Sequence, residues 1–207
     1  MKKTVILLSV TVAATISLYF LPLLSADGYA ASVTKSNFSK FVDAEGNISR
    51  PHEFRKNWAH LGSWLVKNDD QATGPGIHDV YTEAASVEAF RQSGEWPDGA
   101  TLVKEIRSIE NKAMTTGNAQ WAGEPVVWFV MVRDRKNRFP NNKAWGEGWG
   151  WALFEAENPD KNVTTTWKGT GFNNCYGCHL PAEETEWVYI EGYPTIRDAA
   201  NYESAKN

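Results

Sequence analysis

The stretch EPVVWFVMVRD, residues 124–134, decides the fold class that we expect for this chain. Apolar residues occupy both of its alternating faces, which is typical of a strand that is buried on both sides. Such a strand lies inside a sheet that other parts of the chain cover. The stretch therefore predicts a domain built on a β-sheet and not a helical bundle.

The segments around this stretch predict further strands. Residues 77–82, IHDVYT, alternate as a strand does, and the turn Pro97-Asp98-Gly99 leads into another strand. Residues 145–155, WGEGWGWALFE, predict a strand with one face formed by Trp145, Glu147, Trp149, Trp151 and Leu153. On the opposite face we expect other atoms to approach the backbone closely at Gly146, Gly148 and Gly150.

Two segments predict helices. Residues 83–94, EAASVEAFRQSG, place Val87 and Phe90 on one side and Gly94 at the C-cap position. Residues 52–66 predict a short amphipathic helix running towards a strand, because helical spacing separates Phe54, Trp58, Leu61 and Leu65. These patterns together predict a strand-dominated α+β domain.

Residues 1–30 predict a signal peptide for export to the periplasm. Lys2 and Lys3 precede an apolar run from Val5 to Leu24, and small residues follow, with cleavage expected after Ala30. The run is longer than a usual secretory segment, so an uncleaved membrane anchor is the alternative. Either route exports the remainder of the chain.

The remainder has the size and charge of a single exported domain. Its 177 residues can form a sizeable core, in which we expect most of the ten tryptophans. With 19 basic and 24 acidic residues, its net charge is −5. This balance argues against nucleic acid or anionic lipid as the main partner.

The stretch NNCYGCHLP, residues 173–181, carries the chain's two cysteines in a CxxCH pattern. Cys175, Cys178 and His179 predict covalent attachment of one haem c, with His179 as the axial iron ligand. A structural zinc site usually needs four Cys or His ligands, and the chain has only two cysteines. A thioredoxin-like pair would open a helix in a βαβ unit, and the sequence shows no such unit. A plain disulfide would not explain the histidine. The same motif supports export, because bacteria attach haem to CxxCH outside the cytoplasm.

A second axial ligand is not evident. No methionine follows Met131. The residues that would have to reach back to the haem iron are Met114, Met131, His52, His60 and His78. A four-helix cytochrome c′ also has a late CxxCH, but the strand-like segments do not suit a bundle. We therefore expect a five-coordinate iron, which favours catalysis or ligand sensing over simple electron transfer.

Lys104 is the remaining residue of interest. Strand alternation in ATLVKEIRSIE, residues 100–110, places it on one face with Leu102 and Ile106. One interpretation is a lysine that extends from a sheet edge into water. The other is a partly desolvated lysine, whose lowered pKa makes the neutral, nucleophilic amine accessible.

Three features carry a resemblance to a known family: residues 80–105, VYTEAASVEAFRQSGEWPDGATLVKE, the aromatic strands that follow, and the late CYGCH. The family that they resemble is cytochrome P-460. The likeness extends roughly from Ile48 to Ile196, and the run GEWPDGxxLVKE is its specific part. It implies an antiparallel β-sheet domain with a few short helices, often a homodimer, with haem attached near the C-terminus. We therefore divide the chain into a signal peptide (1–30), a polar lead-in (31–50) and a haem domain (51–207).

The resemblance also implies roles for individual residues. Cys175 and Cys178 attach the haem and His179 ligates it. In hydroxylamine-oxidising members the lysine of the VKE run is bonded through its nitrogen to a haem meso carbon, and Lys104 occupies that position. A basic residue precedes the VY strand in that branch, and here it is His78 in place of an arginine. For a distal carboxylate the sequence offers only Asp79 and Glu147, since Thr170 is not acidic.

The resemblance implies two alternative functions. One branch of the family oxidises hydroxylamine to nitrogen oxides and passes electrons to an external acceptor such as another cytochrome c. The related cytochrome c-prime-beta branch binds nitric oxide and lacks the lysine cross-link. We expect the first function, with Lys104 tuning the haem and His78 as the distal acid–base group.

Overall fold

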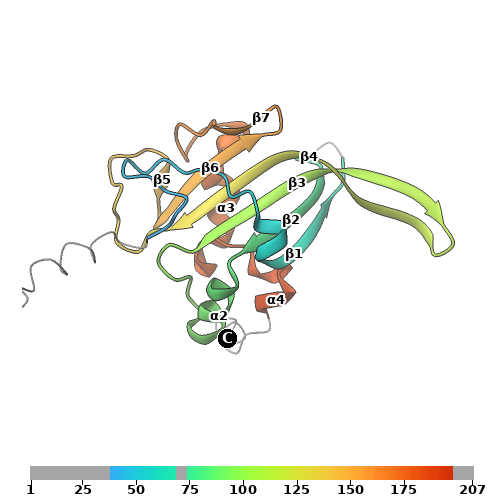
Figure 1. Cartoon of the computed structure of the whole chain (residues 1–207), viewed down its shortest axis with the longest axis horizontal. Helices are drawn as coiled ribbons and strands as arrows, with labels where there is room; N and C mark the ends of the chain where they lie inside the picture. The colour runs from blue at the N-terminus through green and yellow to red at the C-terminus, as the bar shows by residue number, and fades with distance from the viewer. Residues whose placement is uncertain (1–37, 69–73, 198–207) are drawn as a thin grey trace, which may run out of the picture. The chain divides into compact units, whose positions relative to one another are not determined.

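The computed structural model describes residues 38–68 and 74–197, and these residues form an antiparallel sheet with a few short helices (Figure 1). The predicted signal peptide lies outside them, as does part of the lead-in. Within the described ranges no helix is long and apolar enough to cross a membrane. The expected α+β class with an antiparallel sheet is confirmed.

Seven strands make the sheet, in the order β1-β2-β3-β4-β6-β5, with β7 pairing with β6. All pairs are antiparallel. The strands are β1 (Ala59–Val66), β2 (Gly76–Thr82), β3 (Thr101–Met114), β4 (Gly117–Arg133), β5 (Trp145–Gly146), β6 (Trp149–Glu155) and β7 (Asn158–Asn162).

The helices are α1 (Phe54–Asn57), α2 (Ala84–Ser93), α3 (Cys175–His179) and α4 (Pro194–Arg197). Helix α2 matches the prediction for residues 83–94, because Gly94 ends it in the left-handed conformation with φ 73°. Short 3₁₀ turns lie at Gly171–Asn173, Leu180–Thr185 and Ile190–Gly192.

The central strand β4 is covered on both faces over residues 127–132, as the apolar pattern of residues 124–134 predicts, while residues 117–126 are exposed or half-buried. Leu102 and Met131 pack on one face with residues of α2 and of the C-terminal segment 167–196. Val103 and Val130 pack on the other face with Ile48 and Phe54. Figure 1 shows α1 and the C-terminal helices on opposite sides of the sheet. One sheet face is therefore directed at the segment that carries the CxxCH motif.

The predicted helix over residues 52–66 is wrong from Ala59 onward. Only Phe54–Asn57 is helical, and strand β1 follows at once. Leu65, which helical spacing places on the buried face, is 44% exposed. Strand β1 pairs with β2 from Ala59 to Val66, and this pairing outweighs the local spacing of the apolar residues.

The segment 145–155 is a β-hairpin and not one strand. Glu147 and Gly148 have φ of 54° and 76° between β5 and β6, the combination that a tight two-residue hairpin turn requires. The close approach to glycine backbone is confirmed. A Cβ atom at Gly146 would lie 2.3 Å from Trp167, and one at Gly150 would lie 2.6 Å from Trp145.

Candidate functional site

The five residues selected from the sequence line one cavity of about 370 Å³ between the sheet and the C-terminal segment. His78 comes from β2 and Lys104 from β3, while Cys175, Cys178 and His179 come from α3. A second cavity of about 190 Å³ shares with it His78, Lys104, Phe129, Cys178 and His179. The fold thus brings together residues that are up to about a hundred positions apart in the sequence.

Helix α3 places both cysteines on the cavity. They stand three positions apart on one turn, so they share a helix face. Asn174 caps the helix, since its Oδ1 accepts the Gly177 N–H at 3.0 Å. A Cβ atom at position 177 would lie 2.4 Å from the Asn174 amide, so glycine leaves room for this cap. The motif therefore folds into one compact turn.

Both thiols are free, and Cys178 is exposed while Cys175 is buried. Burial raises the pKa of the Cys175 thiol to about 11, so it is protonated at neutral pH. The two sulfurs thus line one cavity from one helical turn, as attachment of a single ligand by two thioethers requires.

His179 is held in one tautomer by the backbone. Its Nδ1–H donates to the Trp187 carbonyl at 2.7 Å, because a carbonyl can only accept. The ring also stands edge-on to Trp151, with centroids 4.9 Å apart. Burial lowers the pKa of His179 to about 4, so the ring is neutral. Nε2 is then the nitrogen left with a lone pair for a metal.

Lys104 is on the cavity side of β3, as strand alternation predicts. Its Nζ lies 4.4 Å from the centroid of the Phe129 ring, and among the described residues no ion pair joins it to a carboxylate. Desolvation lowers the pKa of the Lys104 amine. The interpretation of an edge lysine extending into water is wrong, because Lys104 lines both cavities and β3 is an internal strand.

His78 lies on the same sheet face, one strand away from Lys104. Its Nε2–H donates to the Gly74 carbonyl at 2.7 Å, which leaves Nδ1 as the basic nitrogen of the neutral ring. Burial is the main cause that lowers the pKa of His78, and the charge of Lys104 adds to it. The ring is therefore neutral at pH 7 and able to accept a proton.

Most of the other sequence candidates lie away from the cavities. His52 and His60 are exposed and lie near Asp160 and Asp79, and Met114 is 49% exposed on the β3–β4 hairpin. Met131 is buried and lines the smaller cavity.

The acidic candidates do not line either cavity. Asp79 accepts a hydrogen bond from Ser63 at 2.6 Å on the β1–β2 surface, and Glu147 lies in the β5–β6 turn. Among the described residues that line the two cavities, none is Asp or Glu. The described residues of this wall therefore offer no distal carboxylate. The basic residues that they do offer are His78, Lys104 and His179.

Sequence reasoning missed the aromatic wall of the site. Phe129 and Phe172 have ring centroids 6.1 Å apart, and Trp151 closes the side next to His179. Phe129 could have been assigned to this wall from strand alternation. Phe172 follows no regular pattern, because it stands in a 3₁₀ turn.

These features fit a haem. The cavity walls are mainly apolar, two thiols come from one turn, and one neutral imidazole offers a single nitrogen. The described residues contain no group of three or more His, Cys, Asp or Glu side chains that could hold a metal ion without a cofactor. A lone histidine suits a metal whose other ligands belong to a macrocycle.

Comparison with known proteins identifies the family. A search among curated proteins found no match. A protein-family model described as Cytochrome P460 matches residues 51–190, which is more than half of the chain and includes all five site residues.

Proposed function

We infer the function from one premise, which is that this chain belongs to the cytochrome P460 family. We propose that it is a periplasmic enzyme that oxidises hydroxylamine to nitrogen oxides. The family implies a haem, and Cys175 and Cys178 fit its covalent attachment. The observation that carries the proposal is the desolvated Lys104 amine on the wall of the same cavity as these cysteines.

A haem bound here would supply the redox chemistry for oxidation of a nitrogenous substrate, with an external protein as electron acceptor. His179 would hold the haem iron through Nε2. Lys104 would be the residue joined to the haem through Nζ and would tune its electronic properties. His78 accepts a proton from the substrate at Nδ1, which its bond to the Gly74 carbonyl leaves free. Phe129 and Phe172 supply apolar contacts on the cavity wall.

Two of the proposed partners follow from this chemistry: a small nitrogenous substrate, and another redox protein, such as a cytochrome c, as electron acceptor. The proposed homodimer rests on the family resemblance alone. The signal-like residues 1–30 support export to the periplasm. The second candidate function is binding of nitric oxide without turnover, which the same cavity would serve if Lys104 carried no bond to the haem.

Replacement of Lys104 separates the two functions. In the wild-type protein we expect the ferrous absorption band to lie strongly to the red of ordinary c-type haem. Lys104→Ala and Lys104→Arg should restore an ordinary c-type spectrum and impair hydroxylamine oxidation, while the haem stays attached. Lys112→Arg is the matched control, because Lys112 is on the same strand but exposed.

Mass spectrometry gives an independent result for the same question. A tryptic digest of the wild-type protein should contain the Lys104 peptide joined to the haem peptide of Cys175. An unmodified Lys104 peptide with an ordinary ferrous spectrum would assign the protein to the nitric-oxide-binding branch.

Haem attachment is tested with the cysteines. On a denaturing gel, the Lys104→Ala protein should stain for haem through its two thioethers. The Lys104→Ala, Cys175→Ala, Cys178→Ala protein should not stain, because no other cysteine is present and the Lys104 amine is removed. His179→Ala should keep the stain and change the ligand-field bands, since the thioethers remain and the proximal ligand is lost. Haem that stays bound to the triple variant under denaturing conditions would contradict this assignment.

A further inference from the structure

The hydrogen bond that orients His179 depends on an unusual turn. Its acceptor is the carbonyl of Trp187, and both Glu186 and Trp187 have left-handed backbone conformations, with φ of 55° and 66°. Neither residue is glycine, and two consecutive residues of this kind are unfavourable unless their surroundings impose the conformation. The turn follows the 3₁₀ segment Leu180–Thr185, which comes directly after the CxxCH helix.

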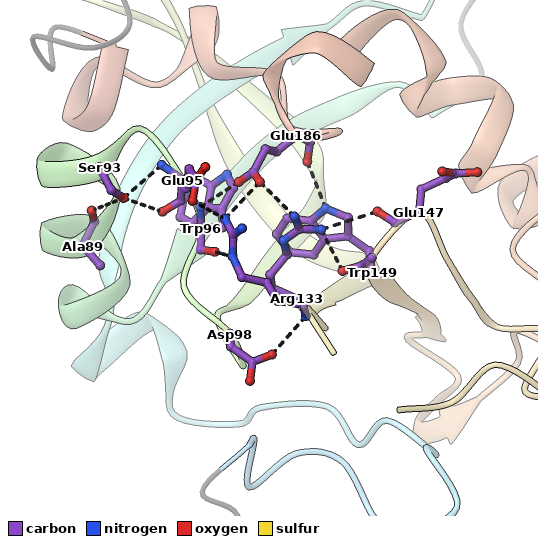
Figure 2. Close-up of polar contacts among 11 residues, drawn as sticks. Ala89, Ser93, Glu95, Trp96, Asp98, Arg133, Glu147, Trp149 and Glu186 are labelled. Carbon is purple, nitrogen blue, oxygen red and sulfur yellow. Dashed lines mark hydrogen bonds and ion pairs between the residues drawn. The ribbon is translucent and has the colours of Figure 1, made fainter. Parts of the chain in front are cut away.

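The surroundings that impose this conformation centre on the Glu186 side chain (Figure 2). Its Oε1 accepts from Arg133 Nη2 at 2.8 Å and from Arg135 Nη2 at 3.1 Å. Its Oε2 accepts the backbone N–H of Trp96 at 2.7 Å. The carboxylate is thus tied to the end of β4 and to the segment after α2.

The backbone of the turn is fixed as well. The Glu186 carbonyl accepts from Trp149 Nε1 at 3.0 Å, and the Trp187 N–H donates to the Ala182 carbonyl at 2.7 Å. Trp149 is fully buried and Arg133 stands over its ring, with 5.3 Å from the guanidinium carbon to the centroid. Arg133 Nη1 also donates to the Gly148 carbonyl at 3.0 Å, so the β5–β6 turn belongs to the same network.

We propose that Glu186 is a positioning residue for the axial histidine. Its carboxylate, held by two arginines and a backbone N–H, keeps the Glu186–Trp187 turn in the conformation that directs the Trp187 carbonyl at His179 Nδ1. A stronger bond at Nδ1 makes the imidazole a better electron donor to its metal. The network therefore sets the strength of the axial bond and, through it, the reduction potential of the haem. This inference rests on His179 being the axial ligand, but not on the identity of the substrate.

The test is the variant Glu186→Gln in the haem-loaded protein. The amide has no negative charge to hold both arginines, so the turn should loosen and the His179–Trp187 hydrogen bond should weaken. We expect the iron–histidine stretching band of the ferrous protein, measured by resonance Raman spectroscopy, to move to lower frequency. The reduction potential should rise in parallel, with haem content unchanged. Glu186→Gly also lacks the carboxylate but adopts the left-handed conformation without strain, so it should shift the band less than Glu186→Gln.

Glu95→Gln is the matched control. Glu95 pairs with the same Arg135 at 3.2 Å, but its side chain is 63% exposed and it does not contact the turn. It should leave both the stretching band and the potential unchanged. If Glu186→Gln prevents folding, Arg135→Gln tests the proposal instead, because it removes one of the two guanidinium contacts of the Glu186 carboxylate. It should shift the iron–histidine band in the same direction by a smaller amount. An unshifted band in folded Glu186→Gln, or in Arg135→Gln when Glu186→Gln does not fold, overturns the proposal. A wild-type protein without an iron–histidine band would instead contradict the assignment of His179.

Discussion

At the scale of single residues, burial gives Lys104 and His78 properties that these side chains lack in water. Desolvation lowers the pKa of both, so the unprotonated forms are more accessible near neutral pH than usual. A neutral lysine amine is a nucleophile and a neutral imidazole is a proton acceptor. The same apolar wall therefore prepares one residue for a covalent bond and the other for proton transfer.

The pH dependence of hydroxylamine oxidation tests the role of His78. Because its pKa lies below the ordinary value of 6.5, the proton-accepting form persists to lower pH than for a histidine in water. The rate should therefore fall on the acid side only below the ordinary histidine range. His78→Gln should lower kcat by about 10²- to 10⁴-fold and remove this acid limb. His60→Gln, at an exposed position on β1, is the control and should keep the wild-type profile. An acid limb that persists in His78→Gln would assign the proton transfer to another group.

At the scale of elements, the β5–β6 hairpin supports the wall on which His179 packs. Trp151 of β6 stacks on Trp167, with centroids 5.7 Å apart, and stands edge-on to the His179 ring. Trp167 in turn lies against the backbone of Gly146. The hairpin therefore supports the site through a series of contacts, from Gly146 to Trp167 and from Trp151 to His179.

Gly146→Ala tests this support. Its Cβ atom would lie 2.3 Å from Trp167, so the indole has to move. We expect a loss of about 1–3 kcal/mol in the free energy of unfolding, measured by urea denaturation followed by circular dichroism. The double variant Gly146→Ala, Trp167→Leu should lose less than the two single changes added together, because the smaller side chain leaves room for the methyl group. Additive losses would mean that the two residues are not coupled.

At the scale of the whole molecule, the end of the β3–β4 hairpin offers apolar surface. In Figure 1 this hairpin projects beyond the neighbouring strands. Met114 and Trp121 on it are 49% and 40% exposed, and Val126 near its base is 48% exposed. Exposed tryptophans are frequent among the residues that contribute most to protein interfaces. We therefore predict that the expected homodimer forms its contact through this hairpin.

Replacement of Trp121 tests that assignment. The wild-type protein should elute as a dimer in size-exclusion chromatography with light scattering. Trp121→Lys should shift the population to the monomer, because a charge replaces an apolar contact. Leu65→Lys introduces the same charge at a residue on β1 that is 44% exposed, and it should remain dimeric. A dimer that survives Trp121→Lys would place the interface elsewhere.

The sequence by itself determined the features that depend on neighbouring residues. The CxxCH motif predicted a haem attachment site, and its three groups lie on one turn of helix α3. Alternation in residues 100–110 placed Lys104 on the cavity side of its strand, and Gly94 ended helix α2. The apolar pattern of residues 124–134 predicted that the second half of β4 is buried on both faces. Short-range periodicity is sufficient for each of these because no distant residue changes which side of a strand or helix turn a side chain occupies.

Only the tertiary structure decided the features that depend on distant partners. Strand β1 forms where helical spacing suggested a helix, because β2 supplies its backbone hydrogen bonds. The meeting of His78 with α3 requires the sheet to close against the C-terminal segment. Glu186 meets Arg133 across 53 positions, and this contact accompanies its left-handed backbone conformation. These outcomes depend on long-range pairing and burial, whose energies exceed local preferences and leave no periodic pattern in the sequence.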